Sequence, residues 1–312
     1  SIGSNMFPDS ADGNYHECAQ KLVKVTTRGS GVYGYVDEMI YEPTGEHLAV
    51  KIIFYEVDSD DKKATILQKC STLKTIDHPN VVKFYGLFFF TQTWLCMELL
   101  DIGLDTLYPP LCKAGKNISE AIVGKIALSI VHGLEHLCTV VKMTHGDVTP
   151  SAMLANVDGS IKITSADVIG THLKKMVPAI RCCPLEVRLY NPPDHLTGHH
   201  GNIVDSSADV WGLGISIMEI SSGKFPYDIH LSPFEQLREI VQDPAPTLPQ
   251  EQFSPAIRDF ISLCLVKAED KRASYKQLLQ SQFLTESKMA LVDMQSFVKD
   301  SMDVVSTNKA AK

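Results

Sequence analysis

Three glycines near the start of the chain, Gly29-x-Gly31-x-x-Gly34, form a pattern that can hold a phosphate group. Glycine lets the backbone come close to a phosphate and turn its N–H groups toward it. The segments on both sides alternate like β-strands, so the glycines join strand to strand, which disfavours a dinucleotide-binding fold. Lys51 lies on the next strand-like segment, and we expect its ammonium group to grip the phosphate. Each signal is weak alone, because such glycines often form only tight turns and such a lysine is often solvated.

The elements that must position these residues change in type near residue 100. Before it, five segments alternate like strands, and residues 58–75 have the composition of a polar helix. After it, a capping box at Asn117 and Glu120 precedes apolar residues at helical spacing, and residues 209–220 are apolar all round, as in a buried helix. The sequence predicts an α+β fold with a β-rich first lobe, a hinge at residues 99–101 and an α-helical second lobe. The predicted strands are residues 21–27, 33–41, 48–55, 81–90 and 93–100.

Composition argues against several classes of protein. The formal net charge is −8 over 312 residues and no basic arm is present, so we expect no nucleic acid partner. The eight cysteines include no Cys-x-x-Cys pair, so the usual zinc spacing is absent and the thiols are expected to be reduced. We find no apolar run of bilayer length and no signal peptide before Met6. We therefore expect no membrane partner and a cytoplasmic location, with the nucleus as a second one.

Further motifs follow in an order that is far more specific than any one of them. Ala49-Val50-Lys51, His145-x-Asp147, Asp194, Asp209-Val-Trp211 and Arg272 occur in the order of protein kinases. With the stretches at residues 225–228, 233–237, 259–265 and 297–299, the chain resembles the mitogen-activated protein kinase kinase family, nearest the branch that activates p38-type kinases. The resemblance implies a bilobal protein-kinase-like fold. Its parts would be an N-terminal extension (1–18), a β-rich N-lobe (19–99), an α-helical C-lobe (100–285) and a C-terminal helix or tail (286–312).

The resemblance also implies roles for individual residues. Asp147 takes the place of the catalytic base, and a nucleotide would be held by the glycines, by apolar side chains around the adenine and by Lys51. The implied nucleotide-binding residues are Gly29, Gly31, Gly34, Val36, Ala49, Lys51, Met97, Glu98, Leu100 and Leu154.

Three positions that would supply charge depart from the family pattern. Lys69 stands where a helix should offer a glutamate to Lys51, and no acidic residue lies between Asp61 and Asp77, so that helix cannot form the ion pair. Two ammonium groups at contact distance repel each other. Gly146 replaces the arginine that would bind a phosphorylated loop, and Thr149 replaces the catalytic-loop lysine.

The positions that would bind metal depart as well. Ala152 replaces the metal-binding asparagine, while Ser165 and Ala166 replace the aspartate and phenylalanine of the DFG motif. Magnesium takes hard oxygen ligands and usually carboxylates, so we expect no metal site. Phosphoryl transfer depends on metal and cations to neutralise the transferred group, so Asp147 is interpreted as a vestigial base that mainly orders its loop.

The segment after these motifs also differs from the family. No serine or threonine lies between His172 and Asn191, so we expect no switch by loop phosphorylation. Asp194 and Arg272 are expected to form a buried pair, and Asp209 is expected to brace the backbone of the catalytic loop.

These observations favour a pseudokinase, a scaffold or regulator in a stress-type kinase cascade with little or no phosphotransfer and no required cofactor. Two alternatives stay open. One is a weak or unorthodox ATP-dependent dual-specificity protein kinase in which Asp167 stands in for the lost metal aspartate. The other is a switch that binds ATP without turnover, since the glycines and Lys51 are compatible with ATP, whereas magnesium is not expected.

The expected partners are protein kinases of a mitogen-activated cascade, either an upstream kinase bound through residues 284–302 or a downstream kinase. Val292, Phe297 and Val298 are the apolar candidates for docking, beside Asp293 and Asp300. A final helix that merely packs on the second lobe is the equally weighted alternative, because one face of an amphipathic helix can pack while the other binds.

Overall fold

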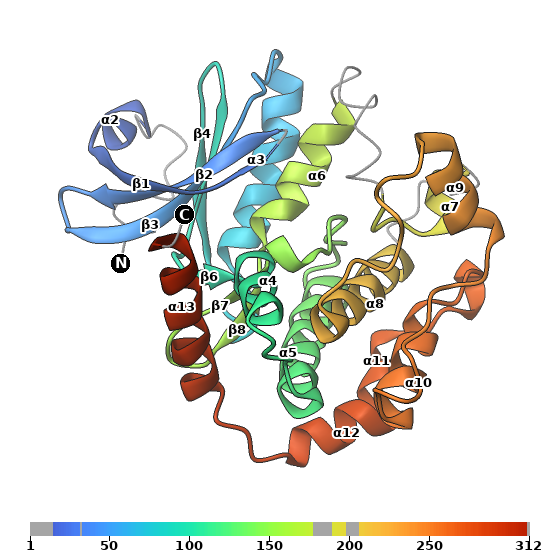
Figure 1. Cartoon of the computed structure of the whole chain (residues 1–312). Helices are drawn as coiled ribbons and strands as arrows, with labels where there is room; N and C mark the ends of the chain where they lie inside the picture. Colours follow the sequence, from blue (N-terminus) through green and yellow to red (C-terminus); the bar gives the residue numbers. More distant parts are fainter. Residues whose placement is uncertain (1–14, 32, 177–188, 198–205, 311–312) are drawn as a thin grey trace. The chain divides into compact units, whose positions relative to one another are not determined.

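The computed structural model describes residues 15–31, 33–176, 189–197 and 206–310, which fall into two compact units (Figure 1). Unit 1 comprises Ser1–Leu100 and Thr164–Val177, and unit 2 comprises Asp101–Ile163 and Pro178–Lys312. The first boundary lies at the predicted hinge. The predicted C-lobe, however, included residues 164–176, and the structure places these with unit 1, because the helix formed by residues 166–176 packs on elements of that unit.

Unit 1 is built on one antiparallel sheet, which confirms the predicted β-rich lobe. Its strands are β1 (Leu22–Gly31), β2 (Gly34–Tyr41), β3 (Glu46–Ile53), β4 (Phe84–Phe89) and β5 (Thr93–Met97), in the order β1-β2-β3-β5-β4. Helix α2 (Tyr15–Gln20) precedes the first strand, and α3 (Asp60–Lys74) and α6 (Ala166–Met176) complete the unit.

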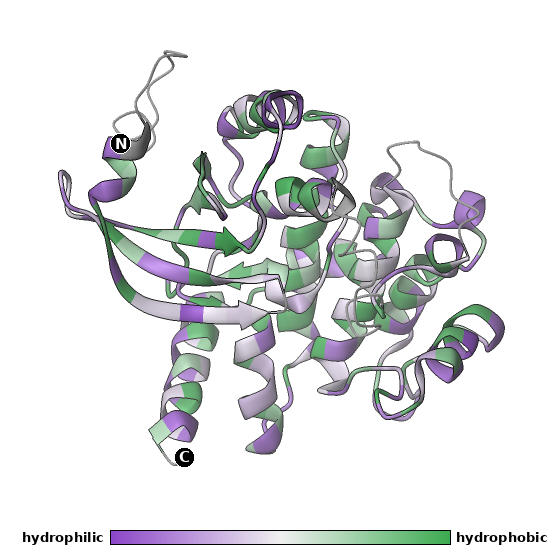
Figure 2. Cartoon of the chain, turned by 90° about the horizontal axis from the view of Figure 1, so that it is seen from above, coloured by the Kyte–Doolittle hydropathy of each residue, from purple (hydrophilic) through white to green (hydrophobic). Residues whose placement is uncertain are grey.

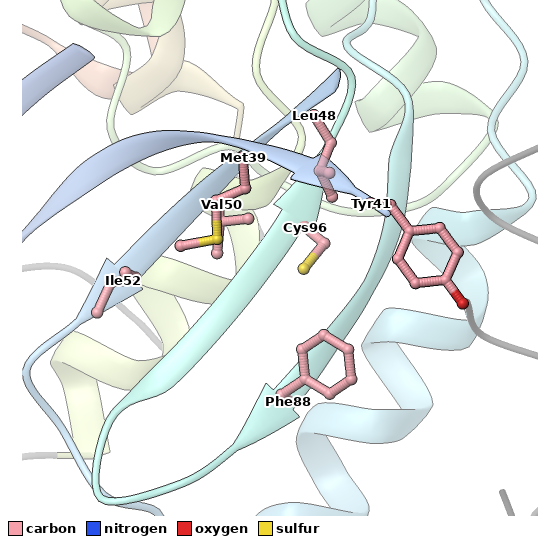
Figure 3. Close-up of a cluster of buried hydrophobic side chains, with 7 residues drawn as sticks. All are labelled: Met39, Tyr41, Leu48, Val50, Ile52, Phe88 and Cys96. Atoms are coloured by element: carbon pink, nitrogen blue, oxygen red, sulfur yellow. The ribbon is translucent and has the colours of Figure 1, made fainter. Parts of the chain in front are cut away.

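The two faces of this sheet have different roles. Hydrophobic and hydrophilic residues follow each other along the strands (Figure 2), because successive side chains point to opposite faces. One face carries an apolar core cluster, which Figure 3 shows in close-up, of Met39, Tyr41, Leu48, Val50, Ile52, Phe88 and Cys96. The opposite face carries Val36, Ala49, Lys51 and Met97, because Val36 pairs with Lys51 and Ala49 pairs with Met97 in the sheet register. We call it the ligand face.

Helices α3 and α6 pack against each other within unit 1. Ser59 caps α3 by accepting a hydrogen bond from the backbone N–H of Lys62, and the buried residues Ile66, Cys70 and Leu73 recur at helical spacing. Helix α6 also contacts β5, and it buries Ile169 and Leu173 completely.

Unit 2 is helical, which confirms the second half of the predicted fold class. Its helices are α4 (Leu104–Lys113), α5 (Glu120–Thr139), α7 (Pro193–Leu196), α8 (Ser207–Ser222), α9 (Pro233–Gln242), α10 (Pro255–Cys264), α11 (Tyr275–Leu279), α12 (Gln282–Met289) and α13 (Met294–Ala310). A small sheet of β6 (Ile102–Gly103), β7 (Met153–Ala155) and β8 (Ile161–Ile163) accompanies them.

Helix α8 is the buried helix that the sequence predicts, and every residue from Asp209 to Ser221 in it is buried. It ends at Gly223, whose φ of +70° lies in the left-handed region that glycine tolerates best. The prediction of a capping box at Asn117 was wrong: Ser119 caps α5, and the carboxylate of Glu120 instead accepts hydrogen bonds from the backbone and hydroxyl of Ser254 at 2.8 and 2.5 Å.

Helix α5 corrects the expectation that no apolar run has bilayer length. By length and hydropathy it is the one helix among the described residues that could cross a membrane. It packs against α8 and α12, and it buries Ile126, Ile130 and Leu134. We therefore interpret it as a core helix of unit 2.

Candidate functional site

The predicted site residues are divided between the two units. Unit 1 carries the three glycines, Lys51 and the positions on and next to the ligand face. Unit 2 carries Asp147, Thr149, Ala152 and Leu154. Each part has its own geometry.

The glycine motif forms a β-hairpin, so the prediction that it joins strand to strand is confirmed. Gly31 pairs with Gly34 across β1 and β2, and Gly29 pairs with Val36. A Cβ atom on Gly34 would lie 1.8 Å from the carbonyl oxygen of Ile52, so no side chain fits there, whereas a Cβ on Gly29 would meet nothing within 4 Å. Packing against β3 therefore requires a glycine at position 34, whereas no contact requires one at position 29.

Glu98 and Leu100, the predicted nucleotide-binding residues near the hinge, make structural contacts. The carboxylate of Glu98 accepts a hydrogen bond from the backbone N–H of Lys83 at 3.0 Å, and the backbone N–H of Glu98 donates to the carbonyl of Lys83 at 2.8 Å. Leu100 is buried. In unit 2, Leu154 lies on β7, where it pairs with Gly103. The structure thus brings Val36, Ala49, Lys51 and Met97 onto one face but leaves Glu98 with a structural role.

A charged cluster on the ligand face escaped the sequence interpretation. Glu38 is buried opposite Ala49 in the sheet, and its carboxylate accepts a hydrogen bond of 2.8 Å from the Nε atom of Arg28. The Nη2 atom of Arg28 lies 2.5 Å from the same carboxylate oxygen, in an ion pair. The Nδ1 atom of His47 lies 2.6 Å from the other carboxylate oxygen. Burial raises the pKa of Glu38, but the hydrogen bonds from His47 and Arg28 outweigh it, so the pKa lies below its ordinary value. The alternation that puts Glu38 on the same face as Val36 was the available signal.

Lys51 has an ion-pair partner that the sequence interpretation did not assign to it. Its ammonium group donates to the Oδ1 atom of Asp167, and the hydroxyl of Thr164 donates to the Oδ2 atom of the same carboxylate. Asp167 is 5% exposed and lies in the first turn of α6. Lys69, on α3, is half-buried and forms no ion pair with any residue that the structure describes. The ion pair is therefore supplied by α6 and not by α3.

Ser165, which replaces the metal-binding aspartate of the DFG motif, lies in the interior of unit 1. Ser165 is completely buried, and its hydroxyl donates a hydrogen bond of 3.0 Å to the carbonyl of Val82. Ala166, also buried, is the first residue of α6. The described residues contain no group of three His, Cys, Asp or Glu side chains that could hold a metal ion. A neutral hydroxyl committed to a carbonyl does not suit magnesium, so these residues do not fit that cofactor.

The catalytic loop in unit 2 is ordered by Asp209 from α8, as predicted. The two carboxylate oxygens of Asp209 accept hydrogen bonds from the backbone N–H groups of His145 and Gly146, both at 2.8 Å. Burial raises the pKa of Asp209 above its ordinary value. Gly146 has a φ of +80°, in the left-handed region that suits glycine.

The other loop positions are held locally. The backbone N–H of Asp147 donates to the Nδ1 atom of His145 at 3.2 Å. Thr149 shares a hydrogen bond of 2.8 Å with the hydroxyl of Ser151, and Ala152 is buried. Thr149 itself thus supplies no cation in place of the lost lysine, and Ala152 supplies no oxygen ligand in place of the lost asparagine.

The predicted pair of Asp194 and Arg272 is confirmed. The Nη2 atom of Arg272 lies 2.8 Å from the Oδ1 atom of Asp194. This pair links α7 to the region before α11, and it supports an intact helical unit.

Comparison with known proteins establishes the family. Residues 22–284 match the family description "Protein kinase domain". The dual specificity mitogen-activated protein kinase kinase sek-1 of Caenorhabditis elegans is 34% identical over 292 residues, which cover 92% of this chain and 85% of the relative. The chain belongs to the MAP kinase kinase family.

Two fungal relatives are similar over most of this chain but extend well beyond it. The MAP kinase kinase PBS2 of Saccharomyces cerevisiae (strain ATCC 204508 / S288c) is 31% identical over 88% of this chain and 41% of its own length, and the protein kinase wis1 of Schizosaccharomyces pombe (strain 972 / ATCC 24843) is 30% identical over 94% of this chain and 48% of its own length.

In this member of the MAP kinase kinase family, the predicted docking segment has a mixed structure. Helix α13 packs on α4 and buries Val298, so that residue is not available to a partner. Val292 and Phe297 are half-buried, while Met289 is 78% exposed and Leu291 is fully exposed. The carboxylate of Asp293 accepts hydrogen bonds from the backbone and hydroxyl of Ser296 at 2.9 and 2.7 Å, so it caps α13. The exposed apolar residues of the segment are thus ones that the sequence interpretation did not single out.

The prediction that no loop phosphorylation occurs concerns the segment between His172 and Asn191. Residues up to 176 belong to α6, whereas residues 177–188 fall outside the described residues.

Proposed function

We propose that this MAP kinase kinase family member is a pseudokinase, a kinase-shaped binding protein that regulates or scaffolds a stress-type kinase cascade in the cytoplasm, with the nucleus as a second location. The observation that carries the proposal is the burial of Ser165, whose hydroxyl donates to the Val82 carbonyl in the place of a metal-binding carboxylate. Without a carboxylate, magnesium has no ligand at this position to bring it to a phosphate chain.

Other losses act in the same direction. Ala152 offers no oxygen ligand for a metal ion, and Thr149 offers no cation. Fewer groups would therefore neutralise the negative charge on the transferred phosphoryl group. This neutralisation usually makes the largest contribution to the rate of phosphoryl transfer. Asp147 alone would contribute little without a positioned phosphate.

A weak dual-specificity kinase is the second candidate, favoured by the names that the relatives carry and by the presence of Asp167 close to the lost aspartate. To bind a metal there, Asp167 would have to release both Lys51 and Thr164. We therefore rank this candidate below the pseudokinase.

Transfer of radiolabelled phosphate from ATP tests the two candidates. We expect no transfer to a MAP kinase or to a generic protein substrate above the level of an Asp147→Ala variant, with magnesium or manganese present. An active MAP kinase kinase assayed in parallel provides the positive control. Transfer that disappears in Asp147→Ala would refute the pseudokinase, and its loss in Asp167→Ala as well would support the second candidate.

We also propose that an upstream protein kinase docks on the segment 284–302, through its exposed link between α12 and α13. Met289 and Leu291 are the apolar contacts that this link offers to a partner. Exposed apolar side chains of this kind gain free energy when a partner covers them, at about 25 cal/mol per Å² of apolar surface.

Point variants test the docking better than truncation, because removing α13 would uncover the residues of α4 on which it packs. The double variant Met289→Ser, Leu291→Ser should reduce capture of upstream MAP kinase kinase kinases by about tenfold, since two buried apolar contacts contribute more than 1.4 kcal/mol together. Val140→Ser, at a 65% exposed position at the end of α5, is the matched control. Equal capture by the double variant and the control would rule the link out as the docking site.

A further inference from the structure

Proline directly follows a hydroxyl side chain at three places in the chain. The hydroxyl residues are Thr149, Ser232 and Ser254. A proline ring disfavours the helical region for the residue before it and biases that residue toward extended backbone. A protein kinase that requires proline directly after the phosphorylated residue, called a proline-directed kinase, needs access to both the hydroxyl and the proline ring. The structure decides which of the three motifs offers that access.

The motif at Thr149 is closed by its loop. Pro150 is buried, so a kinase cannot contact the ring unless the loop unfolds. Thr149 shares a hydrogen bond of 2.8 Å with the hydroxyl of Ser151, and its carbonyl accepts a hydrogen bond of 3.0 Å from the backbone N–H of Ala152. The fold therefore withholds this proline from a partner.

The motif at Ser254 is tied to a distant part of unit 2. Its hydroxyl donates to the Glu120 carboxylate at 2.5 Å, and its backbone N–H donates to the same carboxylate at 2.8 Å. Glu120 begins α5, whereas Ser254 caps α10, so these bonds join two helices. A kinase could take up Ser254 only after both bonds break, and a phosphate there would lie next to the negative charge of Glu120.

The motif at Ser232 is open. Ser232, Pro233 and Phe234 are all exposed, Phe234 to 75%. Ser232 has a φ of −62° and a ψ of 156°, which is extended backbone. Among the described residues its side chain bonds only to Glu235, in the first turn of α9: the hydroxyl donates to the carboxylate at 2.6 Å and accepts from the backbone N–H at 3.4 Å. A partner can therefore take up Ser232 by opening one helical turn, without breaking a hydrogen bond of this side chain to another helix.

We propose that Ser232 is a phosphorylation site, modified by a proline-directed protein kinase. The Oγ atom of Ser232 attacks the γ-phosphorus of ATP held by that kinase and forms a new P–O bond. The bond between the γ-phosphorus and the oxygen that bridges to the β-phosphate breaks, ADP leaves, and the catalytic aspartate of the kinase takes the hydroxyl proton. The inference is independent of the proposed function, because it does not require this chain to transfer phosphate or to lack that activity.

A phosphate on Ser232 suits the start of α9. It carries about 1.5 to 2 negative charges, which the first backbone N–H groups and the positive end of this ten-residue helix stabilise. The carboxylate of Glu235 now bonds to the Ser232 hydroxyl, so repulsion between the two anions would move it away. Phosphorylation thus replaces the capping box of α9 with a phosphate cap, and it adds charge to a surface segment that contains the exposed apolar residues Ile229 and Phe234.

Radiolabelled ATP and an added proline-directed kinase test the inference on the full chain. The labelled residue is identified by mass spectrometry after proteolysis, and we expect label at Ser232 and at neither Thr149 nor Ser254. Ser232→Ala should lower the rate of labelling at least about tenfold, because the other two motifs are accessible only after local unfolding. Ser254→Ala, the matched control, also removes a hydroxyl before a proline and caps a helix, and it should change the rate less than about twofold.

Two further comparisons separate the fold from the local sequence. Pro233→Ala leaves Ser232 exposed at the start of α9, so a loss of labelling in this variant shows that the kinase reads the proline. Peptides of residues 227–238 and 249–260 report how the same kinase treats the two serines when neither is folded. Labelling of the full chain at Ser254 or Thr149 in place of Ser232, or no label at Ser232, would overturn the inference. A reaction without the added kinase measures transfer by this chain itself, so label there would refute the proposed function instead.

Discussion

Replacing Arg272 with alanine should lower the free energy of unfolding of unit 2 by about 3–5 kcal/mol. The guanidinium is buried and donates hydrogen bonds to Asp194 at 2.8 Å, to the carbonyl of Val266 at 2.8 Å and to the carbonyl of Ser207 at 3.0 Å. It also lies 5.3 Å from the ring centre of Trp211. Alanine would leave the half-buried Asp194 carboxylate without its cation, and the carbonyls of the buried Ser207 and the half-buried Val266 without this donor. The loss therefore exceeds that of an ordinary surface ion pair.

The two tryptophans of the chain allow the effect to be measured in one unit. Trp211 lies in unit 2 beside Arg272 and Trp94 lies in unit 1, so urea unfolding in a Trp94→Phe background reports on unit 2 alone. Lys271→Ala changes the neighbouring exposed cation and should alter the free energy of unfolding by less than about 0.5 kcal/mol. Arg272→Lys keeps the charge but not the planar arrangement of donors. Its free energy of unfolding should lie between those of Arg272→Ala and Lys271→Ala. Equal stability of Arg272→Ala and Lys271→Ala would contradict this role of Arg272.

Restoring the aspartate of the DFG motif should destabilise this protein. At neutral pH, Ser165→Asp should lower the free energy of unfolding of unit 1 by about 3 kcal/mol or more. The side chain at position 165 is completely buried and faces the carbonyl of Val82, an acceptor that repels a carboxylate. Ser165→Ala, which loses one hydrogen bond, should cost about 1 kcal/mol, and Ser165→Asn has the size of aspartate without its charge.

The pH dependence separates charge from size in this series. Burial without a donor raises the pKa of the introduced carboxyl above its unfolded value of about 3.9, so the folded state binds the proton more tightly than the unfolded state. The loss in free energy of unfolding is therefore complete when the pH lies above the pKa of this carboxyl in the folded state. It disappears as the pH falls toward the pKa in the unfolded state. Trp94 fluorescence in a Trp211→Phe background reports the unfolding of unit 1. A difference between Ser165→Asp and Ser165→Asn that is small at pH 7, or that does not shrink in acid, would show that the site tolerates a carboxylate.

Much of the fold could be predicted from the sequence because it depends on local patterns. Alternation along the strands predicted the sheet, and the uniform apolarity of residues 209–220 predicted the buried helix α8. The ordered motifs also predicted the pair of Asp194 and Arg272 and the brace from Asp209. Even the departures at Ala152 and Ser165 could be recognised as losses from residue type alone, since neither side chain can act as a carboxylate.

The partners of the altered residues could be found only in the tertiary structure. From the sequence, Asp167 was a substitute metal ligand only in the alternative of an unorthodox kinase. The fold pairs it with Lys51, 116 positions away, because residues 166–176 form a helix that packs within unit 1. The same folding brings Ser165 to Val82, 83 positions apart, and the sheet register brings Glu38 beside Ala49 on the ligand face. Residue type determines which bonds a side chain can form, whereas the packing of apolar surface over long sequence separations decides which of those partners comes within reach.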